Sequence, residues 1–108
     1  MIKRIKNDPK DIILLSIFLK NAGASLEKFR YFNDRHLGVI DDHIYTILIL
    51  DKNNSPVAYG HLDPEKEVVW LGICVSETAT RKGYGKQIMI NLINKATKIG
   101  LKEIFLKV

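Results

Sequence analysis

The stretch "ICVSETATRKGYGKQIMINLINKATKIGLKEIFLKV", residues 73–108, decides the fold of this chain because it holds four successive elements. Its first residues close an apolar run that begins at Val68, and this run predicts a strand over Val68–Val75. The loop "TRKGYGK" follows, with two glycines one residue apart among three cations. Such a loop indicates either a tight turn or a place where a ligand approaches the bare backbone.

After the loop, the sequence predicts a helix and a final strand. The helix is expected from about Gly85 to Ile99, because apolar residues recur every three or four positions along one stripe. The members of this stripe are Ile88, Leu92, Ala96 and Ile99. Gly100 is expected to end the helix, and "EIFLKV" then begins the final strand. In this strand the residues that face one way are Ile104, Leu106 and Val108. A right-handed crossover predicts that the final strand lies parallel to Val68–Val75.

Upstream of this stretch, the pattern predicts a three-stranded antiparallel meander. "HIYTILIL" (His43–Leu50) and "VAYGHL" (Val57–Leu62) are rich in β-branched and aromatic residues, and Val68–Val75 follows them. The clusters "DKNNSP" and "DPEKE" lie between the strands and read as turns, which puts Asp63 and Glu65 in a turn. The expected fold is therefore α/β (α+β), with a mixed, mainly antiparallel sheet flanked by helices.

The first third of the chain is expected to be mainly helical after a short strand at Met1–Ile5. Asp8 suits the cap and Pro9 the first position of a helix from about Pro9 to Lys20. This helix has almost no polar face, so it should be covered on several sides. "LEKFRYFNDR", residues 26–35, is predicted as a second helix.

The composition fits one soluble domain spanning residues 1–108. Its net charge of +5 favours an anionic partner. The sequence nevertheless lacks the aromatic-and-basic strand or basic helix typical of nucleic-acid binding. The single cysteine, Cys74, cannot form an internal disulfide, and no metal-ligand spacing occurs, so a cytoplasmic protein without a metal is expected. Asp8 and Asp11 interrupt the basic start, which argues against a signal peptide, and the apolar stretch is too short for a membrane span.

The glycine loop is a candidate site for an anion. A strand that leads through glycines into a helix lets backbone N–H groups and the helix dipole converge on a phosphate. Gly83 and Gly85 remove β-carbons from the approach, and Arg81, Lys82 and Lys86 add positive charge. The alternative is a plain turn with exposed cations. The spacing fits neither a nucleotide P-loop nor the dinucleotide-binding GxGxxG pattern.

Residues 73–108 resemble the acetyl-CoA-binding core of the GNAT acyltransferase superfamily. The shared features are a strand ending in Val, a [QR]-x-x-G-x-[GA] loop, an amphipathic helix and a following strand. The resemblance implies an acyl-CoA N-acyltransferase-like fold and the transfer of an acetyl group from acetyl-CoA to a primary amine of a small molecule, by direct attack. The upstream order of elements agrees with the same fold.

The chain departs from the family pattern in two ways. The usual Gln or Arg of the loop falls on Thr80, and Arg81 lies one place later. Family members also continue past this strand into a helix and two more strands, so the resemblance implies a chain truncated after its fifth strand. The alternative function is a catalytically impaired CoA-binding module, or a subunit that needs another chain to complete its fold. Self-association as a homo-oligomer, such as a dimer, is expected along the exposed edge of the last strand.

The resemblance also implies which residues bind the cofactor. The backbone of Ile73, Cys74 and Val75 would pair with the pantetheine arm, which behaves like an added strand. The pyrophosphate would lie on the loop, whose members are Arg81, Lys82, Gly83, Tyr84, Gly85 and Lys86. Gly72 either marks a bulge that opens the slot or is a small residue under a packed ring such as Trp70.

Two residues are candidates for the catalytic base. His61 titrates in the useful range and lies on the strand beside the proposed slot, although a lone strand histidine is often structural. Glu67 could act through a water molecule, or it is an exposed turn carboxylate. The acceptor amine is expected between the N-terminal helices and the meander. There "FRYFNDRHLG" forms either a lid or ordinary core aromatics.

Overall fold

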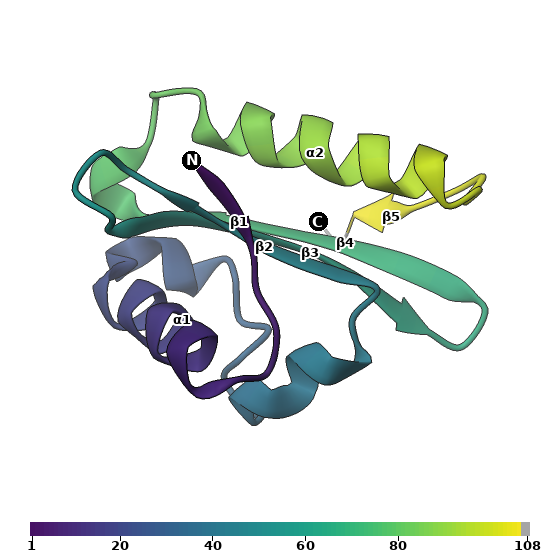
Figure 1. Ribbon diagram of the computed structural model, residues 1–108, viewed down its shortest axis with the longest axis horizontal. Coiled ribbons are helices and arrows are strands. Elements are labelled where there is room, and N and C mark those ends of the chain that lie inside the picture. Colours follow the sequence, from purple (N-terminus) through teal and green to yellow (C-terminus); the bar gives the residue numbers. More distant parts are fainter. Residues whose placement is uncertain (107–108) are drawn as a thin grey trace.

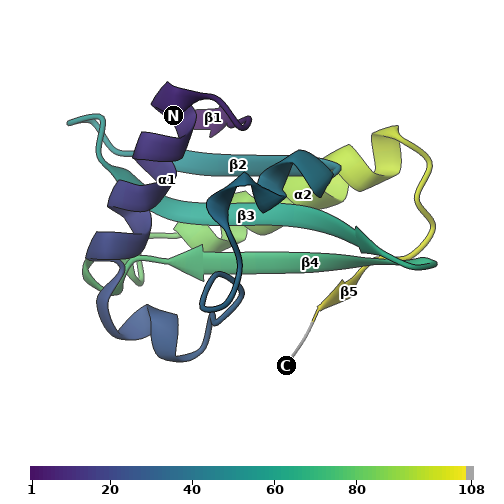
Figure 2. The same cartoon turned by 90° about the horizontal axis from the view of Figure 1, so that it is seen from below.

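The computed structural model describes residues 1–106, in which one five-stranded sheet lies between two helical layers (Figure 1). The strands are β1 (Ile2–Arg4), β2 (Tyr45–Leu50), β3 (Pro56–Glu65), β4 (Val68–Val75) and β5 (Phe105–Leu106). The α-helices are α1 (Pro9–Asn21) and α2 (Tyr84–Lys98). Short 3-10 turns occur at η1 (Gly23–Glu27), η2 (Leu37–Asp42) and η3 (Glu77–Ala79). Figure 2 shows α1 crossing one face of the sheet while α2 lies behind the other.

The sheet has the order β1-β2-β3-β4-β5, with antiparallel pairing up to β4 and a parallel pair at its end. Trp70 pairs with Phe105 and Leu71 with Leu106. The mixed, mainly antiparallel sheet and the parallel final strand are therefore confirmed. The expected place of Val108 in that strand lies outside the described residues.

β3 extends further than the sequence predicted. It runs to Glu65, opposite Val68, and only Lys66 and Glu67 remain for the turn. Lys66 takes the left-handed conformation, with φ 59°, that so short a connection requires. Pro64 is tolerated because pairing with β2 ends at Leu62. The prediction that Asp63 and Glu65 are turn residues was wrong, since both lie on a strand.

α1 forms as predicted, and its start has a clear cause. Asp8 is the N-cap, and its side chain accepts a hydrogen bond of 2.9 Å from the Asp11 amide. The helix buries Leu15 and Phe18 completely against the sheet. α1 packs against β3, η1 and η2, but Ile13 and Ile17 remain 57% and 40% exposed, so the expected cover is incomplete on the face that carries these two residues.

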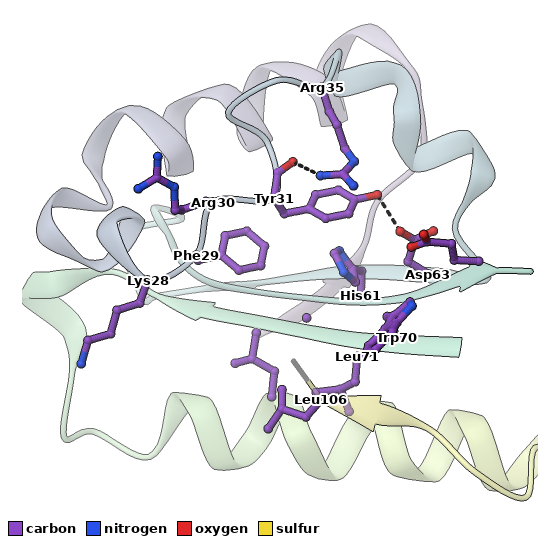
Figure 3. Close-up of a pocket in the computed structure, with 13 residues that line it drawn as sticks. Lys28, Phe29, Arg30, Tyr31, Arg35, His61, Asp63, Trp70, Leu71 and Leu106 are labelled. Atoms are coloured by element: carbon purple, nitrogen blue, oxygen red, sulfur yellow. Dashed lines mark hydrogen bonds between the residues drawn. The ribbon is translucent and has the colours of Figure 1, made fainter. Parts of the chain in front are cut away.

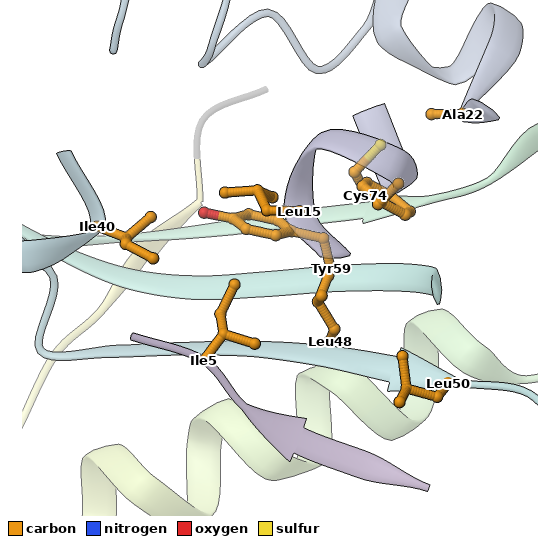
Figure 4. Close-up of a cluster of buried hydrophobic side chains, with 9 residues drawn as sticks. Ile5, Leu15, Ala22, Ile40, Leu48, Leu50, Tyr59 and Cys74 are labelled. Carbon is orange, nitrogen blue, oxygen red and sulfur yellow. The ribbon is translucent and has the colours of Figure 1, made fainter. Parts of the chain in front are cut away.

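The core cluster under α1 joins the helix to three strands (Figure 4). Its buried members are Ile5, Leu15, Phe18, Ala22, Ile40, Leu48, Leu50, Tyr59 and Cys74. Burial raises the pKa of the Cys74 thiol to about 11, so this cysteine acts as a small apolar core residue.

The predicted second helix over residues 26–35 is wrong. The chain makes the short turn η1 and then an irregular stretch, which we call the aromatic segment (residues 28–36). Phe29 lies 5.4 Å from the Tyr59 ring and Phe32 lies 5.6 Å from it, while Tyr31 lies 4.5 Å from the His61 ring. A regular helix places residues 29 and 32 on one face but residue 31 on nearly the opposite side from residue 29, so it could not turn all three rings toward β3. Tertiary stacking therefore overrides local helix preference.

α2 packs on the opposite face of the sheet, as its apolar stripe predicted. It buries Ile88, Leu92 and Ala96 against β2, β3 and β4. Gly60 lies directly beneath Ile88, where a β-carbon would collide with the Ile88 side chain. The glycine thus lets the helix approach the sheet closely, and this approach fixes where the preceding loop emerges beside β4.

Candidate active site

A cavity of about 500 Å³ lies between the aromatic segment and the β4 edge of the sheet (Figure 3). The aromatic segment contributes Phe29 and Tyr31 from above, and β4 contributes Trp70 from below. The charged residues that line it are Lys28, Arg30, Arg35, Asp63 and Glu65. A volume of this size suits a small molecule rather than a folded partner.

Tyr31 fixes the aromatic segment to β3. Its hydroxyl donates a hydrogen bond of 2.9 Å to Asp63 Oδ2 and lies 2.7 Å from His43 Nε2. Arg35 Nη1 donates a 2.7 Å bond to the Tyr31 carbonyl, and the guanidinium lies 4.1 Å from the ring centre. Burial, reinforced by Asp63, raises the pKa of the Tyr31 phenol, so the hydroxyl keeps its proton.

The protonation of this network follows from the single hydroxyl proton of Tyr31. Because that proton goes to Asp63, His43 Nε2 must donate its own proton to the Tyr31 oxygen. His43 Nδ1 then accepts from Thr46 Oγ1, 2.8 Å away. Burial lowers the pKa of His43, although Asp63 and Asp42 oppose this effect. His43 is therefore neutral near pH 7. The hydrogen bonds then form a chain in which Thr46 donates to His43, His43 donates to Tyr31, and Tyr31 donates to Asp63.

His61 lies under the cavity in a closed environment. It is only 2% exposed, and its Nδ1 lies 2.6 Å from the hydroxyl of Tyr59, which burial keeps protonated. If Tyr59 donates to Nδ1, then Nε2 carries the remaining proton and cannot accept another. Burial, with the nearby His43 and Arg35, lowers the pKa of His61 to about 3. The role of His61 as a base stays a prediction, and this environment weakens it.

The imidazole ring of His61 also explains why residue 72 is a glycine. Any β-carbon at this position would collide with the imidazole of His61, which lies opposite it in the sheet. The pairing of β3 with β4 runs one-to-one along its length, so the expected bulge is absent. The other interpretation, that Gly72 is a small residue under a packed ring, is therefore the one that fits, but the ring belongs to His61 and not to Trp70.

Two carboxylates need to be distinguished: Glu67, which the sequence suggested as a base, and Asp63, which it did not. Glu67 is exposed in the turn between β3 and β4 and does not line the cavity. Asp63 does line it, although sequence reasoning had assigned it to a turn. The alternation of Tyr59, His61 and Asp63 puts all three on one face of a strand, and this period of two was the signal that could have found Asp63.

The glycine loop is open, and no hydrogen bond from its amides is recorded within the described residues. Arg81 and Gly83 both have positive φ, 66° and 82°. Within residues 1–106, the amides of residues 81–86 donate no recorded hydrogen bond; the first helical bond runs from Gln87 N to Gly83 O. A β-carbon on Gly83 would meet nothing within 4 Å. The start of α2 therefore presents unpaired donors to solvent, as an anion site requires.

The predicted pantetheine contacts lie at the far end of β4. In the described part of the chain, β5 pairs only with Trp70 and Leu71, so Ile73, Cys74 and Val75 have no recorded strand partner on that side. Ile73 also lines the cavity. The backbone that the sequence assigned to the cofactor thus lies between the glycine loop and the cavity, beyond the part of β4 that residues 105–106 pair with.

Two further properties bear on function. Among the described residues, no group of three His, Cys, Asp or Glu side chains is placed to hold a metal ion. None of the helices within residues 1–106 is both long and apolar enough to cross a membrane.

Comparison with known proteins identifies the family and the fold of this chain. The acetyltransferase (GNAT) family model matches residues 13–108. A tetramutant of the BH1408 protein from Bacillus halodurans is 15% identical, with a TM-score of 0.70 over all of this chain and 82% of that one. No curated protein matches.

Two solved acetyltransferases share the fold and have ligands bound. The GNAT family acetyltransferase from Brucella melitensis in complex with acetyl-CoA is 14% identical, with a TM-score of 0.68 over 98% of this chain and 75% of that one. The aminoglycoside acetyltransferase meta-AAC0020 from an uncultured soil sample, in complex with sisomicin, is 19% identical. Its TM-score is 0.70 over all of this chain and 76% of that one.

Proposed function

This chain belongs to the acetyltransferase (GNAT) family, and we propose that it transfers an acetyl group from acetyl-CoA to a primary amine of a small molecule. The spatial order of three features is the main support for this proposal. The open glycine loop, the end of β4 and the cavity follow one another along the same edge of the sheet, and within residues 1–106 no strand partner on that side is recorded for β4 beyond Leu71. This order matches the parts of the cosubstrate, from its diphosphate through its pantetheine arm to the thioester.

The residues of the loop fit a diphosphate. The amides of residues 81–86, which donate no recorded bond within residues 1–106, supply donors, and the bare Gly83 leaves room for phosphate oxygens. Arg81, Lys82 and Lys86 are exposed cations. Tyr84 would shield one side. The backbone of Ile73, Cys74 and Val75 would hold the pantetheine arm.

The chemistry needs a bound thioester, a polarised carbonyl and a deprotonated amine. The amine nitrogen forms a bond to the carbonyl carbon, and the carbon–sulfur bond breaks. The ammonium loses two protons in total: one is taken up by the departing thiolate, and the other passes through the base to the solvent. A backbone N–H of β4 near Ile73 would stabilise the oxyanion. His61 and Glu67 remain the proposed bases, Glu67 through a water molecule.

The size and walls of the cavity support a small amine as acceptor. Its volume of about 500 Å³ and its aromatic sides, Phe29, Tyr31 and Trp70, suit a compact cationic molecule. The relative that binds the aminoglycoside sisomicin, itself a small-molecule amine, supports the same class.

Substitution of Gly83 tests cofactor binding. Gly83→Asp adds a side chain and a negative charge at the open amides, so we expect acetyl-CoA binding to disappear from calorimetric titrations while the fold remains. Gly100→Asp is the matched control, because Gly100 also has positive φ, 84°, and a β-carbon there would also meet nothing within 4 Å, but it lies at the other end of α2. Unchanged acetyl-CoA affinity in Gly83→Asp, or an equal loss in Gly100→Asp, contradicts the proposal.

The alternative is a CoA-binding module that does not turn over, or a subunit completed by another chain. Release of free thiol from acetyl-CoA in the presence of a panel of primary amines separates the two functions. Binding of acetyl-CoA without thiol release for any amine favours the module. Self-association through β5, where Phe105 and Leu106 are 39% and 54% exposed, is tested by sedimentation over a range of concentrations.

A further inference from the structure

We propose that Asp63 binds a second, non-reacting cationic group of the acceptor, so that the preferred substrates are diamines rather than simple monoamines. The inference rests on the proposed function and concerns the same cavity. It follows from the register of β3 and β4, the hydrogen bonds of Asp63, and the distribution of charge along the cavity.

The register places Asp63 away from the expected point of reaction. β5 occupies the edge of β4 at Trp70 and Leu71, so a thioester arm along this edge ends no further than Gly72 or Ile73. Gly72 lies opposite His61, whereas Asp63 lies opposite Trp70. Two strand residues separate these levels, which corresponds to about 7 Å along the sheet. Asp63 is therefore too distant to pair with the reacting nitrogen, but it can pair with a charge further along the acceptor.

The carboxylate of Asp63 is fixed in place and still has an oxygen to offer. Its Oδ2 accepts from Tyr31, which is in turn held by His43 and Thr46. Within residues 1–106, no hydrogen bond to Oδ1 and no salt bridge to Asp63 is recorded. A held carboxylate loses little entropy when it pairs with an ammonium, which makes the interaction stronger than that of a free surface residue.

Apart from Arg35, which lies over the Tyr31 ring on the Asp63 side, the charges of the cavity are separated along its length. Figure 3 shows Lys28 and Arg30 toward the end of β4 where the glycine loop begins, and Asp63 with Trp70 at the opposite end. Glu65 is two residues beyond Asp63 on the same strand and also lines the cavity. The anionic cosubstrate thus meets the cationic end, and a cationic acceptor meets Asp63, the held carboxylate, beside an aromatic ring.

The neighbouring groups leave Asp63 available for a cation. Tyr31 and Arg35 face it from the aromatic segment, Asp42 from η2, and His43 from the position that follows η2. Arg35 is engaged with the Tyr31 carbonyl and ring and makes no salt bridge with Asp63 among the described residues. Tyr31 and His43 are neutral near pH 7 and act as positioning residues.

Three probes with the same five-carbon skeleton test the inference on the unmodified protein. They are diaminopentane, pentylamine and aminopentanoic acid, which differ only in the far group: cationic, apolar or anionic. We expect kcat/KM for thiol release from acetyl-CoA to be at least tenfold higher with diaminopentane than with pentylamine, and lowest with aminopentanoic acid. Equal rates for diaminopentane and pentylamine, or a preference for the acid through Arg30 or Lys28, overturn the inference.

Variants then assign the preference to Asp63. Asp63→Asn should remove most of the advantage of diaminopentane over pentylamine, since the charged hydrogen bond to the far ammonium is lost. Tyr31→Phe keeps the ring but removes the hydrogen bond to the Asp63 carboxylate, so it should partly reduce the ratio of kcat/KM for diaminopentane to that for pentylamine. Glu65→Gln, at an exposed carboxylate without a recorded partner among the described residues, is the control and should reduce it least. A fall in rate that is equal for both amines indicates a merely structural role and contradicts the inference.

Direct binding separates failure of the inference from failure of the proposed function. If acetyl-CoA binds but no amine releases thiol, the proposed enzyme activity fails. Calorimetric titration of the CoA-loaded protein with diaminopentane and pentylamine then still decides the inference. Tighter binding of diaminopentane that Asp63→Asn abolishes supports it, and equal affinities, or equally undetectable binding, overturn it.

Discussion

The buried histidine under the cavity makes a quantitative prediction about acid stability. Burial, His43 and Arg35 lower the pKa of His61 from 6.5 to about 3. Between these values the unfolded chain binds a proton that the folded chain does not, so the free energy of unfolding falls as pH falls. From pH 7 to pH 5 the unfolded histidine becomes largely protonated while the folded one stays neutral. This difference corresponds to a loss of about 2 kcal/mol from His61 alone.

Urea denaturation of the protein and of His61→Gln measures this loss. The single tryptophan, Trp70, reports unfolding by fluorescence at pH 7 and pH 5. His61→Gln cannot take up the proton, so we expect its free energy of unfolding to fall less than that of the original protein over the same interval, by about 2 kcal/mol. His43 and the carboxylates are present in both proteins, and their contributions cancel in this comparison. An equal fall in the two proteins refutes the reasoning, because His61 would then titrate alike in the folded and unfolded states.

Three further substitutions test the packing that positions the site, each by the free energy of unfolding in urea. Gly72→Ala should cost about 1–3 kcal/mol because its β-carbon collides with the ring of His61, and a simultaneous His61→Ala should recover part of the loss. Leu92→Ala should cost about 2–5 kcal/mol, whereas Ile93→Ala, at a residue 45% exposed, should cost much less. Asp8→Ala removes the cap of α1 and should cost about 1 kcal/mol, and no change would mean that the cap bond is not formed in solution.

The candidate site divides into a part that local sequence predicted and a part that it could not. The glycine loop was predicted because glycine spacing, cations and helix start lie within seven consecutive residues, Thr80–Lys86. Asp63 was missed because Asp and Pro together favour turns, whereas the long pairing of β3 with β4 carries the strand through Pro64. His61 was identified as a residue of interest, but its burial depends on Tyr59 and Gly72.

The sequence by itself determined the order of α1, β2, β3, β4, α2 and β5, since hydrophobic periods of two and of three to four residues and the caps at Asp8 and Gly100 are local signals. Only the tertiary structure decided the path of the aromatic segment. Its rings gain more by stacking on Tyr59 and His61, some thirty residues later in the chain, than by forming a helix. The cavity and the hydrogen bonds of Asp63 arise from that choice, because contacts between distant segments form only once the sheet has brought them together.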